Sequence, residues 1–216
     1  MPLNLKNIPL FKGLPKGDLD AIAAHATKKT LPRNVTVITE GEFTQSLYLI
    51  LSGKVKVFLN DEDGKEFILD VKGAGEYFGE MVLDEGPRSA SVATVEPCEL
   101  AIVSGNDFRQ LVLGHPHMAL SLIKNLIQMA RGLNENVRSL ATLDVYGRVS
   151  RLLLDLAVKQ GEKLVVPEKL RQQDIANRVG ASREVINRIL RDLTASGHIS
   201  IEAGKIIINR LPPRRG

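Results

Sequence analysis

The chain has 216 residues, enough for one large domain or two smaller ones, and its 44% hydrophobic and 25% charged residues are ordinary for a globular protein. No apolar run approaches the roughly 18 residues of a membrane span, and the N-terminal segment lacks the basic start and apolar core of a signal peptide. The one cysteine, Cys98, excludes an internal disulfide framework. These features predict a cytoplasmic protein with no membrane contact.

The charge is unevenly distributed along the chain, whose formal net charge is +4. Residues 145–216 contain 14 Lys and Arg against 7 Asp and Glu, a net charge of +7, whereas residues 1–144 carry a net charge of −3. A basic C-terminal third favours contact with a polyanion such as nucleic acid.

In chain order, a short amphipathic helix is predicted at residues 18–26, and the apolar period then changes to two. Six short segments rich in Val, Ile and Leu alternate with turn residues, which is typical of an antiparallel sandwich or jelly roll. The predicted strands are VTVIT (35–39), SLYLIL (46–51), KVKVFLN (54–60), KEFILDV (65–71), ASVATV (90–95) and CELAIV (98–103).

Residues 116–142 predict one long helix, which at about 1.5 Å per residue would be roughly 40 Å long. Two apolar stripes indicate that it packs against two bodies, which we take to be its own domain and a second copy of the chain. An ordinary buried helix of a single domain is the alternative. The predicted dimer seam is Leu122, Leu126, Met129, Leu133 and Leu140, and the second stripe is Leu120, Ile123, Ile127 and Ala130.

The C-terminal third predicts a winged helix-turn-helix. Asp144 offers an N-cap for a helix over 145–160, which Gly161 ends. Two close helices, 171–179 and 182–195, are separated by Gly180, and a two-stranded hairpin follows from residue 197. Helix, helix, tight turn, helix and hairpin is the order of elements in that DNA-binding fold.

Residues suited to an anion gather in Phe78–Ala90 (FGEMVLDEGPRSA). Gly79 permits a close backbone approach, and N–H groups at such turns can cradle an anion. Arg88 offers a planar fork of donors that suits phosphate, and Ser89 adds a hydroxyl donor. Glu80 is an acceptor suited to a ribose hydroxyl. A structural Glu80–Arg88 ion pair is the alternative.

A second charged cluster lies in SREVINRILRDL, where Ser182 is a good N-cap and Glu184 in the first turn suits the helix dipole. Arg183, Glu184 and Arg188 can share one exposed sector. Arginine suits guanine O6 and N7, and glutamate suits the cytosine N4 amino group. A solvated charged surface face is the alternative. We include Asn187 with these four residues in the predicted DNA-binding set.

These motifs resemble those of the cyclic-AMP receptor protein (CRP/FNR) family of bacterial transcription regulators. FGEM followed by RSA is similar to the phosphate-binding cassette of cyclic-nucleotide-binding domains. The resemblance implies that Glu80 binds the ribose 2′-hydroxyl and that Arg88 and Ser89 bind the cyclic phosphate. Gly79 and Met81 then belong to the cassette backbone.

SREVINR is similar to the recognition helix of the same family, which implies base-reading roles for Arg183, Glu184 and Arg188. Cyclic-AMP responders of the family place a Thr-Ser pair against the adenine on the long helix. Two alignments are open here, Leu133-Asn134 and Asn136-Val137, so Asn134 and Asn136 are the candidate base contacts and neither alignment supplies Thr-Ser.

The resemblance implies an α+β fold with three parts: a β-roll (jelly roll) cyclic-nucleotide-binding sensor domain (1–115), a long dimerisation helix (116–143) and a winged helix-turn-helix domain (144–216). A cyclic nucleotide, most simply cAMP, would reorient the two heads of a homodimer on an inverted repeat with half-sites like TGTGA. RNA polymerase is a further expected partner.

No nucleophile–base motif and no Walker-type loop is present in the sequence, and we expect neither an enzyme nor a metal site. Two alternatives stay open: a ligand-independent regulator with a degenerate sensor pocket, and a nucleotide-binding signalling module that does not bind DNA.

Overall fold

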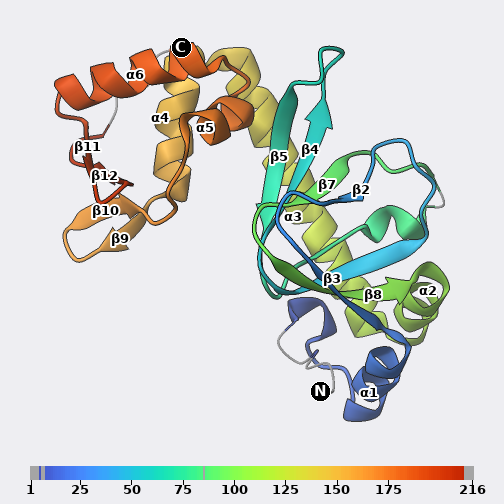
Figure 1. Ribbon diagram of the computed structural model, residues 1–216. Coiled ribbons are helices and arrows are strands. Elements are labelled where there is room, and N and C mark those ends of the chain that lie inside the picture. The colour runs from blue at the N-terminus through green and yellow to red at the C-terminus, as the bar shows by residue number, and fades with distance from the viewer. Residues whose placement is uncertain (1–4, 6–7, 85, 212–216) are drawn as a thin grey trace. The chain divides into compact units, whose positions relative to one another are not determined.

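A computed structural model (Figure 1) describes residues 5, 8–84 and 86–211 of the chain. The chain forms two compact units: residues 1–59 with 68–129, and residues 60–67 with 130–216. Helix α3 (Pro116–Thr142) begins in the first unit and ends in the second, and its bounds confirm the predicted long helix.

The first unit contains a β-roll of two four-stranded antiparallel sheets, as the alternating apolar pattern predicts. All six predicted strands are present, and two more, β1 and β6, were not predicted. Four of the five residues of β1 are exposed, which leaves little apolar signal in its sequence. In order across each sheet, the first consists of β1 (Thr27–Leu31), β8 (Cys98–Ser104), β3 (Ser46–Ser52) and β6 (Tyr77–Phe78), and the second of β2 (Thr36–Ile38), β7 (Ser91–Thr94), β4 (Val55–Asn60) and β5 (Glu66–Lys72).

The first sheet separates two hydrophobic cores, because successive side chains of a strand point to opposite faces. Leu47 and Leu49 of β3 pack against the helices, whereas Tyr48 and Ile50 face the interior of the roll. The outer core is covered by the 3-10 turn Pro9–Phe11, α1 (Lys16–His25), α2 (Gly105–Gly114) and the first turns of α3 (Figure 1).

The second unit holds three further helices, α4 (Val145–Leu156), α5 (Gln172–Val179) and α6 (Arg183–Ala195). Asp144 caps α4 as predicted, since its Oδ1 accepts a hydrogen bond of 2.7 Å from the Gly147 N–H. The apolar faces of the three helices form one core with the sheet beside them.

Two predictions for the C-terminal domain need correction: the end of the helix from residue 145 and the strands of the wing. The helix from residue 145 ends at Leu156 instead of reaching residue 160, and the predicted two-stranded hairpin is part of a four-stranded sheet. Gly161 (φ 62°) serves the turn between two strands rather than the end of a helix, and positive φ is easily adopted by glycine. The sheet order is β11 (Ile199–Glu202), β12 (Lys205–Ile208), β10 (Lys163–Val166) and β9 (Val158–Gln160).

Most of the apolar surface of α3 is exposed. The second stripe, Leu120, Ile123, Ile127 and Ala130, is exposed throughout, so the expectation that it packs against its own domain is wrong. Leu122 is the exception in the predicted seam: it is 4% exposed and packs in the core of the first unit, so its assignment to a surface open to a second chain is wrong. The alternative of an ordinary buried helix does not fit the rest, because the exposed fractions are 42% for Leu126, 36% for Met129, 49% for Leu133 and 45% for Leu140. Within the described residues, no helix has the length and apolar character to cross a membrane.

Candidate ligand site and nucleic-acid interface

Arg88 is the centre of the first site, and its side chain is buried, with only 4% of the residue exposed. Its Nε–H donates to Thr44 Oγ1 at 2.8 Å, one Nη1–H to the Gly79 carbonyl at 2.8 Å, and one Nη2–H to the Ser46 carbonyl at 2.7 Å. A guanidinium has five N–H groups, so two, one on each terminal nitrogen, lie outside these three bonds. Burial lowers the pKa of Arg88, although arginine stays charged at neutral pH.

The three acceptors around Arg88 are neutral, and among the described residues Glu80 acts on the guanidinium only through its charge at a distance, which favours the charged form, and not through an ion-pair contact. The alternative of a structural ion pair is therefore not what this conformation contains. A buried cation without a carboxylate in contact is unfavourable, and an anionic ligand would compensate it. Glu80 begins the 3-10 turn Glu80–Leu83 and stays partly exposed beside the cradle.

Gly79 is required by the backbone at this corner. Its φ is 85°, and a Cβ at this position would lie 2.8 Å from the Ser46 carbonyl oxygen and 3.2 Å from Arg88 Nη1. The close approach expected from the sequence is therefore present, but it is made to strand β3 and to the arginine of the chain itself. Any larger residue would clash with the Ser46 carbonyl, would crowd the guanidinium and would be strained at this φ.

Two further cassette residues meet at the exposed rim of the site. The Ser89 hydroxyl donates to Met81 Sδ at 2.8 Å, and Met81 is 39% exposed. Sequence reasoning missed Thr44 and Ser46, because they lie 44 and 42 residues before Arg88 and carry no recognisable motif. The loop before β3 is also tied to the cassette backbone, through the Arg88 N–H and the Glu42 carbonyl.

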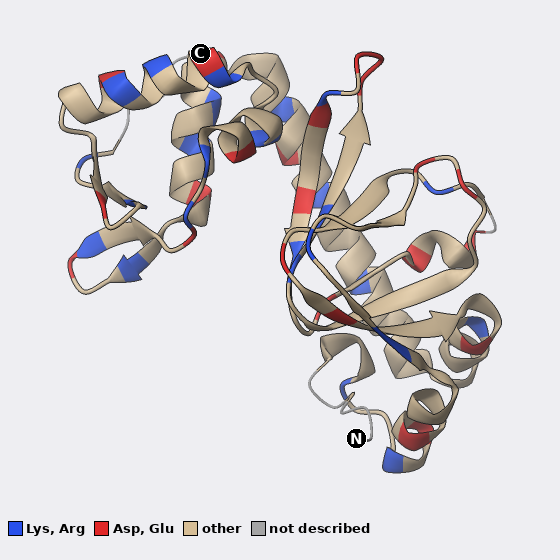
Figure 2. Ribbon diagram, in the orientation of Figure 1, with Lys and Arg blue, Asp and Glu red and all other residues tan. Residues whose placement is uncertain are grey.

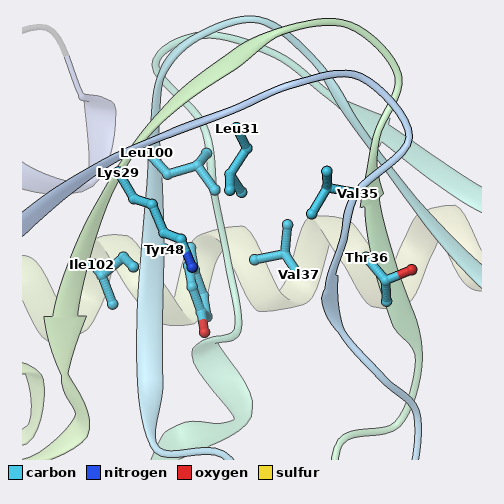
Figure 3. Close-up of a pocket in the computed structure, with 8 residues that line it drawn as sticks. All are labelled: Lys29, Leu31, Val35, Thr36, Val37, Tyr48, Leu100 and Ile102. Carbon is cyan, nitrogen blue, oxygen red and sulfur yellow. The ribbon is translucent and has the colours of Figure 1, made fainter.

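An aromatic pair extends from the cradle into the roll. The rings of Tyr48 and Phe78 stack with centroids 4.9 Å apart and an interplanar angle of 2°. Burial raises the pKa of the Tyr48 hydroxyl, which therefore stays protonated at neutral pH. Tyr48 also lines a cavity of about 90 Å³ inside the roll (Figure 3), smaller than the about 300–1,000 Å³ of typical ligand pockets. The cavity can therefore form only part of a nucleotide site; its other lining residues are Lys29, Leu31, Val35, Thr36, Val37, Leu100 and Ile102.

The candidate base contacts on α3, Asn134 and Asn136, are both exposed. They belong to the second unit, whereas Arg88 belongs to the first. Their assignment stays a prediction.

The second site is the N-terminal half of α6, a helix whose ribbon carries both basic and acidic positions in Figure 2. The Ser182 hydroxyl caps the helix by accepting from the Val185 N–H at 3.4 Å. Arg183, Glu184 and Arg188 are exposed, as predicted. A hydrogen bond from its own backbone N–H lowers the pKa of the Glu184 carboxyl, and the Ser182 hydroxyl and the Arg183 charge act in the same direction. Glu184 is therefore a pure hydrogen-bond acceptor at neutral pH.

The turn before α6 is held from two sides. Gly180 adopts φ 65° at the C-terminal end of α5, a conformation that favours glycine. Arg148 of α4 donates from Nε to the Val179 carbonyl at 2.9 Å and from Nη1 to the Leu143 carbonyl at 2.9 Å. Sequence reasoning did not single out Arg148, since its partners are backbone atoms without a sequence signal.

Comparison with known proteins identifies both domains. Residues 28–115 match the model of cyclic nucleotide-binding domains, and residues 147–212 match that of Crp-like helix-turn-helix domains. The CRP-like cAMP-activated global transcriptional regulator of Mycobacterium tuberculosis is 34% identical over 205 residues, 93% of this chain and 92% of that protein. The chain belongs to the CRP family of transcription regulators. It is thus a DNA-binding regulator that carries a cyclic-nucleotide-binding domain, and not an enzyme.

Two further relatives show how wide the CRP family is. The cAMP-activated global transcriptional regulator CRP of Pasteurella multocida is 37% identical over 196 residues, 88% of this chain and 93% of that protein. A solved structure of the c-di-GMP-responsive global regulator CLP of Xanthomonas campestris has a TM-score of 0.78 at 27% identity, and the match covers 90% of this chain and 99% of that one. The fold class and the family predicted from the sequence are confirmed.

Proposed function

We propose that this CRP-family protein is a homodimer whose DNA binding is gated by a cyclic nucleotide held at Arg88, with cAMP as the first candidate. The observation that carries the proposal is the buried Arg88 guanidinium, which contacts only neutral acceptors and keeps two N–H groups outside those contacts. The relatives at 34% and 37% identity are described as cAMP-activated, which favours cAMP over the cyclic dinucleotide of the relative at 27% identity.

In the proposed complex, the two remaining N–H groups of Arg88 and the Ser89 hydroxyl bind the cyclic phosphate. Glu80 accepts from the ribose 2′-hydroxyl, while Gly79 keeps the turn close enough for Arg88 to stay in place. Met81 covers the rim. Asn134 and Asn136 of α3 are the candidates for contact with the base.

The proposed DNA contacts are made by α6. Ser182 fixes the start of the helix, and Arg183, Glu184 and Arg188 read base edges in the major groove. The expected operator is an inverted repeat with half-sites like TGTGA, and RNA polymerase is the expected protein partner at the promoter. The relatives named above come from bacteria, whose chromosome lies in the cytoplasm. We therefore expect this protein to act in the cytoplasm.

The proposed domains are a β-roll sensor (1–115), a dimerisation helix (116–143) and a winged helix-turn-helix (144–216). The dimer would form through the exposed apolar face of α3, where burial against an identical helix removes leucine side chains from water. The residues of the predicted seam that are exposed, and so available to a second chain, are Leu126, Met129, Leu133 and Leu140.

The deciding experiment combines calorimetry and gel retardation on the full chain. Calorimetry would use cAMP, cGMP and c-di-GMP, and gel retardation would measure affinity for a TGTGA inverted repeat with and without each nucleotide. We expect cAMP to bind and to raise operator affinity. Equal operator affinity in every case would instead support the ligand-independent regulator, and a response only to c-di-GMP would overturn the choice of nucleotide.

A further inference from the structure

We propose that Asn187 is a fourth base-reading residue of α6, selective for adenine, and that Gln172 of α5 is the residue that positions it. This inference rests on the proposed function, because it assumes that α6 enters the major groove.

The place of Asn187 on the helix supports a reading role. It lies three residues after Glu184 and four after Arg183, and residues at steps of three and four share one face of a helix. The opposite face of α6 is occupied by the core residues Ile186, Ile189, Leu190 and Leu193. Asn187 is therefore directed to the same side as the charged readers.

Asn187 differs from those readers in being held by a neighbouring helix. Gln172 Nε2 donates to Asn187 Oδ1 at 3.3 Å, and both residues are partly buried, whereas Glu184 and Arg188 are exposed. Gln172 is itself fixed as the first residue of α5. The Arg171 N–H before it donates to Asp174 Oδ2 at 2.9 Å and caps that helix.

The hydrogen bond places the Asn187 amide beside Gln172, with Oδ1 as the acceptor in this conformation. With Oδ1 toward the Gln172 donor, one lone pair of that oxygen and both Nδ2 hydrogens remain for other contacts. Adenine presents an N6 donor and an N7 acceptor side by side in the major groove, and an asparagine amide matches this pair with its oxygen and its nitrogen.

The same orientation disfavours guanine. Guanine presents two acceptors, O6 and N7, so the Asn187 oxygen would face another oxygen. Rotating the Asn187 amide by 180° would keep a bond to Gln172 only if the Gln172 amide rotated as well, and Asn187 Oδ1 would then find no donor on the major-groove edge of guanine. The contact from α5 thus restricts where the Asn187 amide lies, and the amide matches both groups of adenine but not both groups of guanine.

The first test is a binding-site selection with the full-length Asn187→Ala protein, followed by affinity measurements on operators changed at the affected base pair. We expect adenine to lose its advantage at one base pair in each half-site, by about 5- to 100-fold. Asn187→Ser, which keeps a polar group but cannot make the bidentate contact, should lose the same preference. Equal melting temperatures of the variants and the parent protein verify that the fold is kept.

The positioning role is tested by Gln172→Met, which keeps the length of the side chain and removes its donor. The adenine preference should fall at the base pair that Asn187→Ala identifies, and the double variant should be no worse there than Asn187→Ala alone. Gln173→Met is the matched control, because Gln173 Nε2 makes a similar bond to Asn177 Oδ1 at 2.7 Å entirely within α5. The control should leave every base preference unchanged.

The results separate this inference from the function on which it rests. A consensus that is unchanged by Asn187→Ala but altered by Glu184→Ala would overturn the inference and leave the proposed reading helix in place. If neither substitution alters the consensus, α6 does not read the groove and both proposals fail. A preference altered by Asn187→Ala but unaffected by Gln172→Met would overturn the positioning role.

Discussion

At the scale of single residues, Arg88 donates to three groups of the fold and is also the proposed phosphate contact. Arg88→Leu should abolish nucleotide binding in calorimetry, because it removes the charge-assisted contact with the phosphate. It should also lower the free energy of unfolding by about 1–3 kcal/mol, since the Ser46 and Gly79 carbonyls and the Thr44 hydroxyl lose their donor. Wild-type affinity in a folded Arg88→Leu protein would place the ligand elsewhere.

Thr44 allows a milder test of the same cradle. Thr44→Val keeps the shape of the side chain and removes only the acceptor of the Arg88 Nε–H, so nucleotide affinity should fall while the charge remains. Thr44→Ser restores the hydroxyl and should restore most of the affinity. Calorimetry on the two variants measures the difference, and equal affinities would show that this bond does not hold the guanidinium for the ligand.

The lowered pKa of Glu184 predicts a base preference that does not change with pH near neutrality. The pKa of the Glu184 carboxyl is lowered, so the group stays ionised at any pH above that pKa. It becomes protonated only as the pH falls through the pKa. Glutamate normally titrates at about pH 4.3. The preference for cytosine at the base pair that Glu184 reads should therefore stay constant between about pH 7.5 and about pH 5.5. Glu184→Ala should remove that preference while non-specific affinity stays level or rises, as a charge repelled by phosphates is lost. Competition binding at the two pH values decides whether the carboxylate is the acceptor.

At the scale of elements, α3 is the helix whose exposed surface needs an explanation. Replacing Leu126 and Leu133 by glutamate should give monomers in sedimentation, because like charges would face each other across the seam. Operator affinity should fall when the dimer is lost, since a single DNA-binding domain reads only one half-site. Gln128→Glu on the same helix is the control and should leave the dimer intact. A dimer that survives the double substitution would mean that another surface joins the chains.

At the scale of the whole molecule, the symmetry of the proposed dimer predicts the form of the operator. Two recognition helices related by a two-fold axis enter successive major grooves about 34–36 Å apart. Half-sites one helical turn apart should therefore bind best, and inserting about five base pairs between them should bring affinity close to the non-specific level, because the second half-site then faces the other side of the duplex. Gel retardation on operators of varied spacing tests this, and affinity that is insensitive to spacing would argue against a symmetric dimer on DNA.

The sequence alone determined the local elements and the two motifs. Period-two segments specified six strands, and Asp144 specified the start of α4. The residue types of the cassette and of α6 predict phosphate and base chemistry. These features are readable because they depend on neighbours a few residues apart, through helix caps, side-chain periodicity and the conformational freedom of Gly79.

Only the tertiary structure decided which distant residues meet. The strand order of the first sheet brings the loop before β3 to the cassette, and this gives Arg88 its partners Thr44 and Ser46. The packing of α3 on the same sheet buries Leu122 and leaves Leu126 exposed, although both fit one heptad pattern. The contact of Gln172 with Asn187 likewise exists only because α5 and α6 share a core. Such pairings depend on long-range packing, which no local pattern in the chain encodes.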